Sequence, residues 1–409
     1  MHSAPQKPHE SPFNVIAIVA ALGYFVDIYD LILFGIVRVP SLKDLGFAGT
    51  ELHAAGDLLL NMQMIGLLVG GVLWGVLGDL RGRLSVLFGS IIIYSLANLA
   101  NGFVHDLDTY AVLRFIAGVG LAGELGAGIT LVNETMAKES RGWGTTLVAS
   151  FGVLGAVLAF GVAELFDWRT AYFVGGGLGL LLLVLRFSTY ESGLFESVKK
   201  SRTQFARFDL LFRSPRRVLR YLACIGIGVP IWFTVGIFVF LAHRFDEVLG
   251  LSGITAGQAI LWTYIGLAVG DLGSGWLSQS IRSRKKAVFV FITALLVIDA
   301  LFLVLTSSTT LFYAMCVLMG IAAGYWALFV TIASEQFGTN LRATVTTTVP
   351  NFVRGAVVPI VLGFNGLVAA GFDLIGAAAL VGAACFAIAY VSLASLRETF
   401  AIDLDYLEE

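Results

Sequence analysis

Two acidic residues near the start of the chain have the spacing of a pair that could share a proton. Asp27 and Asp30 lie in an apolar stretch, residues 14–38, and on a helix their Cβ atoms would be ~5–6 Å apart on one face. Two carboxylates this close in a low dielectric do not both ionise cheaply, so one should bind and release a proton near neutral pH. We expect this pair to couple proton movement to another process. The alternative is that one acid only pairs with a basic side chain and holds helices together.

Arg354 is a cation inside another apolar stretch. It lies about midway along residues 343–370, and a charged side chain at membrane depth costs ~2.5–3.5 kcal/mol. A guanidinium there needs an anionic partner, which is either the carboxylate of a bound solute or an acid of the protein. Pro350 and Gly355 indicate a broken helix, which is tolerated where the backbone lines a cavity.

Further polar residues could line the same cavity. Arg114 could favour the charged form of a nearby acid, or it could only extend to the membrane surface. Glu124 follows a glycine-rich run in the same apolar stretch as Arg114, residues 110–133. We expect it to reach the cavity and take part in proton coupling. For aromatic residues, packing in the core or against lipid is the alternative to cavity lining. The neutral candidates for substrate binding are Tyr29, Gln63, Tyr325 and Asn351.

The elements that must position these residues are transmembrane helices. The 409 residues are 57% hydrophobic and 13% charged, which is too little charge to cover a soluble surface. Stretches of ~20 apolar residues can cross a hydrocarbon core of ~30 Å. They predict an all-α integral membrane protein of twelve transmembrane helices, at residues 14–38, 53–77, 84–104, 110–133, 143–165, 170–188, 219–242, 256–280, 286–306, 311–334, 343–370 and 374–396.

The distribution of lysine and arginine predicts the orientation. If both termini are cytoplasmic, twenty basic residues fall on the cytoplasmic side, four fall on the outer side, and two lie inside helices; this is the bias expected of inner-membrane proteins. We therefore expect a multi-pass protein of the inner (cytoplasmic) membrane. Its units would be a six-helix bundle (1–188), a basic cytoplasmic linker (189–218) and a second six-helix bundle (219–409).

The two bundles repeat each other in sequence. The segment G-V-L-G-D-L-R-G-R-L, from Gly75, is followed 200 residues later by G-W-L-S-Q-S-I-R-S-R, from Gly275. At an offset of 201, Asn133–Gly142 aligns with Ser334–Ala343, so that Glu134 matches Glu335. Two similar six-helix halves predict a substrate site at their interface, near the middle of the membrane.

These motifs resemble those of the major facilitator superfamily. Gly75 to Leu84 is similar to that family's G-x-L-x-D-R-x-G-R-R signature, with Leu80 and Leu84 in place of basic residues. Arg114 to Gly118 resembles the R-x-x-x-G motif of its proton-coupled members. Asp27-Ile-Tyr-Asp30 resembles the D-G-[FY]-D of its aromatic-acid and metabolite:proton symporters. The resemblance implies the two-bundle transporter fold and a monomer.

Charged residues at the expected cytoplasmic ends of the helices are candidates for a gate. They would hold the cytoplasmic end closed in one state and separate in the other; alternatively, they only fix the orientation of the helices. The gate candidates are Asp79 with Arg81 and Arg83, Glu134 with Arg141, and the repeat of that second pair, Glu335 with Arg342.

Taken together, these features predict a proton-coupled symporter that imports a small organic metabolite, expected to be anionic, by alternating access. A proton-coupled exporter and a passive uniporter of the same fold are the alternatives. The sequence has no nucleophile–base pair, metal cluster or phosphate-binding loop, so we expect no enzyme activity, metal or cofactor. The expected partners are the solute and the lipid bilayer, not nucleic acid, with protons as the coupling ion and sodium left open.

Overall fold

The computed structural model describes residues 15–81, 83–126, 128, 148–191, 209–400 and 408. All regular secondary structure in these ranges is helical. Eight of the described helices are long and apolar enough to cross a membrane, or nine if the bent pair Pro215–Gly226 and Val229–Val239 is one span. The chain is therefore an all-helical membrane protein with several spans.

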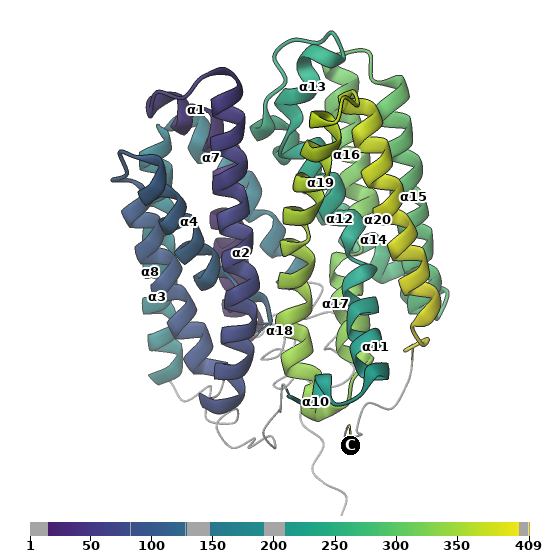
Figure 1. Ribbon diagram of the computed structural model, residues 1–409. Helices are drawn as coiled ribbons and strands as arrows, with labels where there is room; N and C mark the ends of the chain where they lie inside the picture. Colours follow the sequence, from purple (N-terminus) through teal and green to yellow (C-terminus); the bar gives the residue numbers. More distant parts are fainter. Residues whose placement is uncertain are drawn as a thin grey trace, which may run out of the picture.

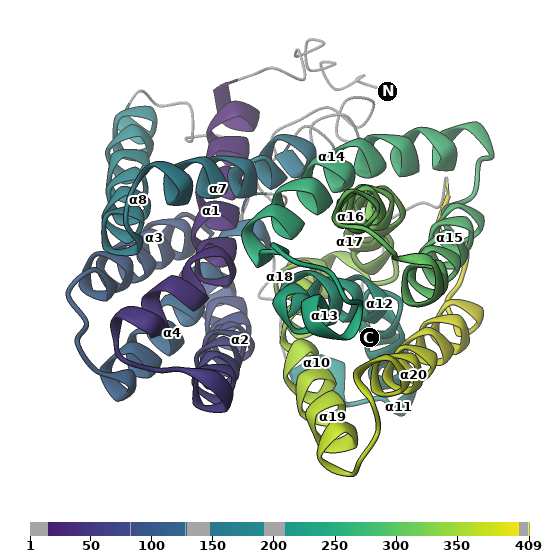
Figure 2. The same cartoon turned by 90° about the horizontal axis from the view of Figure 1, so that it is seen from above.

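The N-terminal group of helices stands on one side of the molecule (Figures 1 and 2). It consists of α1 (Val15–Asp44), α2 (Gly49–Arg81), α3 (Arg83–Asn101), α4 (Leu107–Leu121), α7 (Gly155–Leu165) and α8 (Trp168–Glu191).

The C-terminal group stands beside it, and the two meet where α2 packs against α18 and where α7 and α1 pack against α14. It consists of α10 (Asp209–Phe212), α11 (Pro215–Gly226), α12 (Val229–Phe233), the π-helix η1 (Thr234–Val239), α13 (Ala242–Val248), α14 (Ala256–Ser280), α15 (Arg284–Leu305), α16 (Thr309–Ala323), α17 (Trp326–Glu335), α18 (Thr339–Gly355), α19 (Val357–Ala369) and α20 (Leu374–Ser395).

The helix bounds differ from the predicted ones at several places. At the linker expected at 189–218, α8 ends at Glu191 and α11 begins at Pro215, so the flanking helices extend a few residues into the expected range; residues 192–208 lie outside the described ranges. In three of the predicted spans, the described helix is not both long enough and apolar enough to count as a membrane span. The apolar part of α3, Ser85–Asn101, is short, α4 has 15 described residues, and α14 is 25 residues long but more polar.

Hydrogen-bonding side chains define where several helices begin. The residue before the first turn accepts a hydrogen bond from the backbone N–H three positions later, which satisfies one of the free donors at a helix start. This arrangement occurs at Asp106 (α4), Thr255 (α14), Ser283 (α15), Ser308 (α16) and Asp373 (α20).

Glycines bring one pair of helices into backbone contact in each half. A Cβ atom on Gly66 of α2 would lie 2.2 Å from the carbonyl oxygen of Phe115 in α4. Two hundred residues later, a Cβ atom on Gly266 of α14 would lie 2.2 Å from the carbonyl oxygen of Val317 in α16. Gly320 of α16 makes the same kind of contact, 2.0 Å from the oxygen of Thr263. The repeat seen in the sequence is thus also a repeat of close helix packing.

Three helical stretches of the C-terminal half are broken. α11 and the stretch from Val229 to Val239 are bent by 42°, α16 gives way to α17 around Gly324, and α18 gives way to α19 at Ala356. Breaks expose backbone groups that must be satisfied inside the protein. The Tyr325 hydroxyl donates to the carbonyl of Ile227 (3.0 Å), and Asp271 Oδ1 accepts from the N–H of Ala327 (3.0 Å).

We predict that Gly320→Ala destabilises the protein strongly. The added methyl group would meet the backbone of α14, which cannot move aside like a side chain, and overpacking of this kind costs ~1–3 kcal/mol or more. Thermal unfolding of the detergent-purified protein measures the effect. Gly363→Ala is the matched control, because its Cβ would have no neighbour within 4 Å. Equal unfolding temperatures for the two variants would contradict the packing argument.

Candidate functional site

A buried ion pair joins the two halves. Arg354 of α18 places Nη2 3.5 Å from Oδ2 of Asp27 in α1, and the two side chains are 1% and 0% exposed. They are 327 positions apart in the sequence. Both were predicted to be functional, and the acid that Arg354 needed is supplied by the opposite half of the protein.

Aromatic side chains surround this pair. The Arg354 guanidinium lies 5.6 Å from the centre of the Trp326 ring, which is within the range of a cation–π interaction. Tyr24 and Tyr264 are close enough to interact electrostatically with the same guanidinium. Trp232 packs edge-on against Trp326, with 6.4 Å between the ring centres.

Several polar atoms of this cluster are buried without a hydrogen-bond partner among the described residues. They are Nε and Nη1 of Arg354, Oδ1 of Asp27, and Nε1 of both Trp326 and Trp232. A buried unsatisfied donor costs ~1–3 kcal/mol, and more when it is charged. The cluster therefore presents charged donors at Arg354 and neutral N–H donors at the two tryptophans.

Asp30 is buried among other polar groups within the N-terminal half. Its Oδ1 lies against α8, where a Cβ on Gly175 would be 2.2 Å away, and it interacts electrostatically with Arg114 and with Asp27. Both of its oxygens are buried without a hydrogen-bond partner in the described structure. The two acids of α1 thus interact, as predicted from their spacing, but Asp27 contacts the opposite half and Asp30 its own.

Arg114 is fully buried, so the alternative that it extends to the membrane surface is wrong. Its Nη2 donates to Asn98 Oδ1 (2.7 Å) and its Nε to Asn101 Oδ1 (3.3 Å), both from α3. The guanidinium also lies 4.7 Å from the centre of the Tyr172 ring. These contacts fix the cation near Asp30 without neutralising it.

Glu124 is held by a basic residue. Arg186 of α8 donates to both of its oxygens, at 3.0 and 2.8 Å, and Ser90 donates to Oε1 at 3.0 Å. The expected role of Glu124 in proton coupling stays a prediction. The geometry is that of a closed, bidentate ion pair, which binds N-terminal helices together.

The four neutral candidates bond to the backbone of neighbouring helices. Tyr29 donates to Ala171 (2.9 Å), Gln63 to Leu31 (3.0 Å) and Tyr325 to Ile227 (3.0 Å). Asn351 donates across the interface to the carbonyl of Ala122 (2.8 Å), and a Cβ atom on Gly71 would lie 3.0 Å from its own Cβ. Their predicted role in substrate binding is not tested by these contacts.

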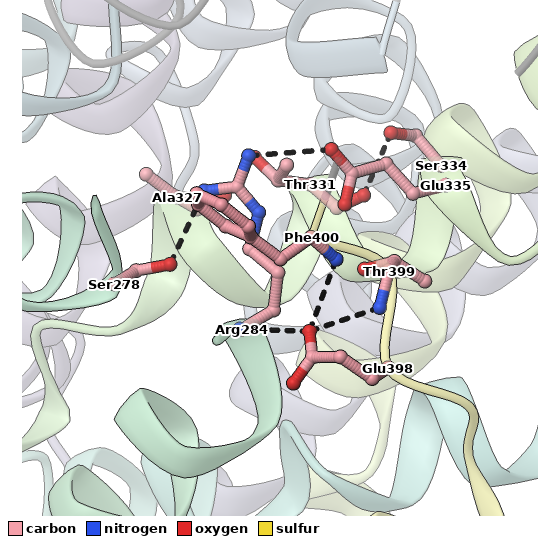
Figure 3. A network of polar contacts seen from close by, with 9 residues as sticks. All are labelled: Ser278, Arg284, Ala327, Thr331, Ser334, Glu335, Glu398, Thr399 and Phe400. Carbon is pink, nitrogen blue, oxygen red and sulfur yellow. Dashed lines mark hydrogen bonds and ion pairs between the residues drawn. The ribbon is translucent and has the colours of Figure 1, made fainter. Parts of the chain in front are cut away.

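At one end of the C-terminal half, charged groups form the network drawn in Figure 3. Glu335 pairs with Arg284 (3.4 Å), and Arg284 also donates to Ser278 (3.2 Å). Arg342, the expected partner of Glu335, donates through Nε to the carbonyl of Ser334 (3.2 Å) and also interacts electrostatically with Glu335. The Glu335 carboxylate therefore connects α17 to α15.

Glu398 closes the same network. Its carboxylate accepts from the N–H of Arg284 (2.9 Å), Thr399 (2.9 Å) and Phe400 (3.0 Å). Although burial opposes ionisation, these bonds and one from Ser283 hold the pKa of Glu398 below its ordinary value. An ionised carboxylate thus caps α15.

The structure does not describe the side chains of the other gate candidates. Glu134 and Arg141 lie outside the described residues. Asp79, Arg81 and Arg83 lie at the end of α2 and the start of α3, and their side chains are outside the described part of the structure. The gate assignment therefore stays a prediction.

The sequence identified most of the buried charged residues of the site, but not the side chains with which they pair. Arg186 is one of the twenty basic residues that the sequence assigns to the cytoplasmic side, whereas its side chain is buried. Its place inside an apolar stretch, residues 170–188, was the signal that it needed an internal acid. Trp232 gave no signal, because one more aromatic in an apolar stretch does not stand out.

One family profile and several known proteins are similar to this chain in sequence. The sequence profile of the Major Facilitator Superfamily matches residues 20–360. A niacin transporter of Acinetobacter baylyi is 26% identical, over 80% of this chain and 80% of its own length. A gentisate transporter of Corynebacterium glutamicum is 25% identical, over 95% of this chain and 89% of its own.

A solved structure has an arrangement of helices similar to that of this chain. The proton:xylose symporter XylE, bound to 6-bromo-6-deoxy-D-glucose, superposes with a TM-score of 0.72. The alignment covers 95% of this chain and 97% of that one, at 15% sequence identity. The likeness concerns the fold.

We predict that Arg186→Met destabilises the protein by ~3–5 kcal/mol, because it leaves Glu124 as an uncompensated buried charge. The double variant Glu124→Gln, Arg186→Met should recover part of this loss, since no buried charge remains. Thermal unfolding measures both. Asp44→Asn, which breaks the exposed Asp44–Arg169 pair, is the control and should cost under ~1 kcal/mol. A double variant no more stable than Arg186→Met would argue against an ion pair.

Proposed function

From the premise that this chain belongs to the Major Facilitator Superfamily, we propose that it is a proton-coupled symporter that imports a small cyclic carboxylate. The family membership makes it a multi-pass secondary transporter of small organic metabolites and not an enzyme. The coupling ion, the direction and the solute are the proposal, and the Asp27–Arg354 pair carries it.

Competition for one cation would couple the proton to the solute. While Asp27 is ionised it holds Arg354, and a solute carboxylate can bind the same guanidinium only at the cost of repulsion from Asp27. A proton on Asp27 removes both the attraction and the repulsion. The guanidinium is then available to the solute through Nε and Nη1, the atoms that have no other partner among the described residues.

This exchange keeps the charge of the site constant. The pair begins as one anion and one cation, and it ends as a neutral acid with a cation bound to the anionic solute. The loaded site therefore carries no more net charge than the empty one, which keeps the electrostatic cost of its movement low. Asp30, beside Arg114, would be a second proton acceptor on the path to Asp27.

The proposed solute class follows from the chemistry around Arg354. Trp326 and Trp232 offer aromatic surface and two indole N–H donors, which suits a ring that carries a hydrogen-bond acceptor. Niacin and gentisate, after which the two relatives are named, are aromatic carboxylates with such acceptors. We therefore infer a cyclic carboxylate bearing a ring nitrogen, hydroxyl or carbonyl group.

We further propose the predicted membrane arrangement as the frame of this mechanism. It has twelve spans in two six-helix halves, both termini in the cytoplasm, a monomer in the inner membrane, and rocking of the halves about the central site. The three broken stretches of the C-terminal half support it, since broken helices in transporters of this kind surround the binding site.

We predict that Asp27→Asn abolishes accumulation but keeps exchange. An amide at this position imitates the protonated acid and cannot titrate, so the carrier still binds and moves solute but no longer follows the proton gradient. Proteoliposomes under an inward proton gradient, tested with labelled niacin and gentisate, measure accumulation and counterflow separately. Asp44→Asn, at the exposed ion pair, is the control and should accumulate solute normally.

The outcome also separates the rival functions. Outward proton movement on addition of external solute would identify an exporter, and counterflow without accumulation in the unmodified protein would identify a uniporter. Accumulation by Asp27→Asn equal to that of the unmodified protein would remove Asp27 from the coupling mechanism.

Arg354→Ala is predicted to raise the Kd of carboxylate solutes about 10- to 100-fold. Hydrogen bonds to a charged group contribute ~1.5–3 kcal/mol, and 1.4 kcal/mol corresponds to tenfold in Kd. Calorimetric titration of the purified protein measures the change. Trp326→Phe is the companion variant: it keeps the ring but removes the N–H donor, so it should weaken ring-acceptor solutes and spare benzoate. Unchanged binding by Arg354→Ala would place the solute elsewhere.

A further inference from the structure

A second polar cluster also joins the two halves, at the end of the molecule opposite the network of Figure 3. It contains side chains from α1 and α2 of the N-terminal half and from α13 and α19 of the C-terminal half. We call it the Asp57 cluster, and it consists of Arg38, His53, Asp57, His243, Arg244 and Asn365.

Asp57 is the centre of this cluster. Its Oδ2 accepts from Arg244 Nη2 (2.7 Å) and from Asn365 Nδ2 (2.8 Å), both of the opposite half. Arg244 Nη1 in turn donates to Asn365 Oδ1 (2.8 Å). The three side chains thus close a ring of hydrogen bonds across the interface.

Arg38 reaches the same carboxylate from inside the N-terminal half. Its Nη2 lies 3.5 Å from Asp57 Oδ1, and its side chain is 2% exposed. Gly56 makes room for it, because a Cβ there would lie 2.4 Å from Arg38 Nε. One carboxylate therefore separates two cations, Arg38 and Arg244, that belong to different halves.

Two histidines extend the cluster across the interface. His243 Nε2 lies 3.3 Å from His53 Nδ1, and the rings are stacked with their centres 5.2 Å apart. This contact needs one hydrogen between the two nitrogens, so it is lost when both are protonated. Burial and then the positive charges of Arg38, His53 and Arg244 lower the pKa of His243 to about 3.

The cluster lies near the loops that follow α1, α13 and α19, the end at which α13 is labelled in Figure 1. In the proposed orientation this is the outer end. Because the cluster ties α2 to α13 and α19, the halves cannot separate here without breaking it.

We propose that the Asp57 cluster is a latch that holds the outer end of the transporter closed and that protonation of its histidines favours opening. The latch rests on the proposed movement of the halves, but it does not depend on the solute, on Asp27 or on proton coupling. Its role is to make the outward-open state less populated at neutral and alkaline external pH.

The pH dependence has a definite sign. The groups that face His243 are Arg38 from α1, His53 and Asp57 from α2, and Arg244 on its own helix. In the closed state the pKa of His243 is low; in the open, hydrated state it returns towards the ordinary value of ~6.5. The histidines therefore favour the closed state fully above pH ~6.5, and the population of the closed state decreases as the pH falls below that value.

The test is a distance across the outer end. Spin labels at His105→Cys, between α3 and α4, and at Ser307→Cys, between α15 and α16, occupy exposed loop positions in opposite halves. Pulsed electron resonance on the full-length purified protein then reports the closed and open populations, with no solute added.

We expect Asp57→Asn to increase the open population at least tenfold, because Arg38 and Arg244 then face each other without a carboxylate between them. Arg244→Gln should shift it in the same direction, which guards against misfolding of a single variant. Asp44→Asn, which breaks an ion pair within the N-terminal half at the same end, should leave the distances unchanged. Unaltered distances in both cluster variants would overturn the proposal.

The histidines are tested by repeating the distance measurement at about pH 8 and about pH 5, which lie above and below the ordinary histidine pKa of ~6.5. The unmodified protein should open as the pH falls, and the double variant His53→Gln, His243→Gln should show no such change. A pH response that survives in this double variant would remove the histidines from the latch. Transport is not measured in either experiment, so a failure here and a failure of the proposed symport are distinguishable.

Discussion

A buried charge needs a partner, and this requirement organises the structure around Arg354. Its guanidinium is 1% exposed, and the acid beside it, Asp27, belongs to the other half of the protein. Neither charge can be left alone in a low dielectric without a large penalty. The pair must therefore stay together, take up a proton, or exchange one partner for another anion. In the proposed mechanism each of these possibilities corresponds to a different state of the transporter, so that one ion pair links protonation, solute binding and the relative position of the halves.

The surrounding structure divides the work between the two halves. The N-terminal half contributes the acids proposed to carry the proton, with Asp30 beside Arg114, and a bidentate Glu124–Arg186 pair that holds its helices together. The C-terminal half contributes broken helices whose free backbone groups are satisfied by Tyr325 and Asp271. Tight glycine contacts, α2 with α4 and α14 with α16, stiffen each half. Among the described residues, the polar contacts between the halves include the Asp27–Arg354 pair, the Asn351–Ala122 hydrogen bond and the Asp57 cluster, and these would be exchanged in the proposed conformational change.

Much of this could be predicted from the sequence because charges in apolar stretches are conspicuous. Asp27, Asp30, Arg114 and Arg354 were found in that way. The repeat at about 200 residues was also visible in the sequence, and the structure adds the paired glycine contacts to it. The partners could not be predicted. Asp27 and Arg354 are 327 residues apart, and Asp57 with Arg244 are 187 apart; only the packing of helices decides which charges meet. Arg186 and Arg38 show the same limit, since a basic residue near a helix end resembles a surface charge until its burial is known.

The most direct measurement of the central claim is the number of protons that the purified protein takes up when a carboxylate binds. Calorimetric titration in buffers of different ionisation enthalpy gives this number without any membrane or gradient. If Asp27 must be protonated before Arg354 can accept the solute, binding at pH values where Asp27 is ionised should take up about one proton per carboxylate, by linkage. Binding of the same solute with no proton uptake across the whole pH range would contradict the account.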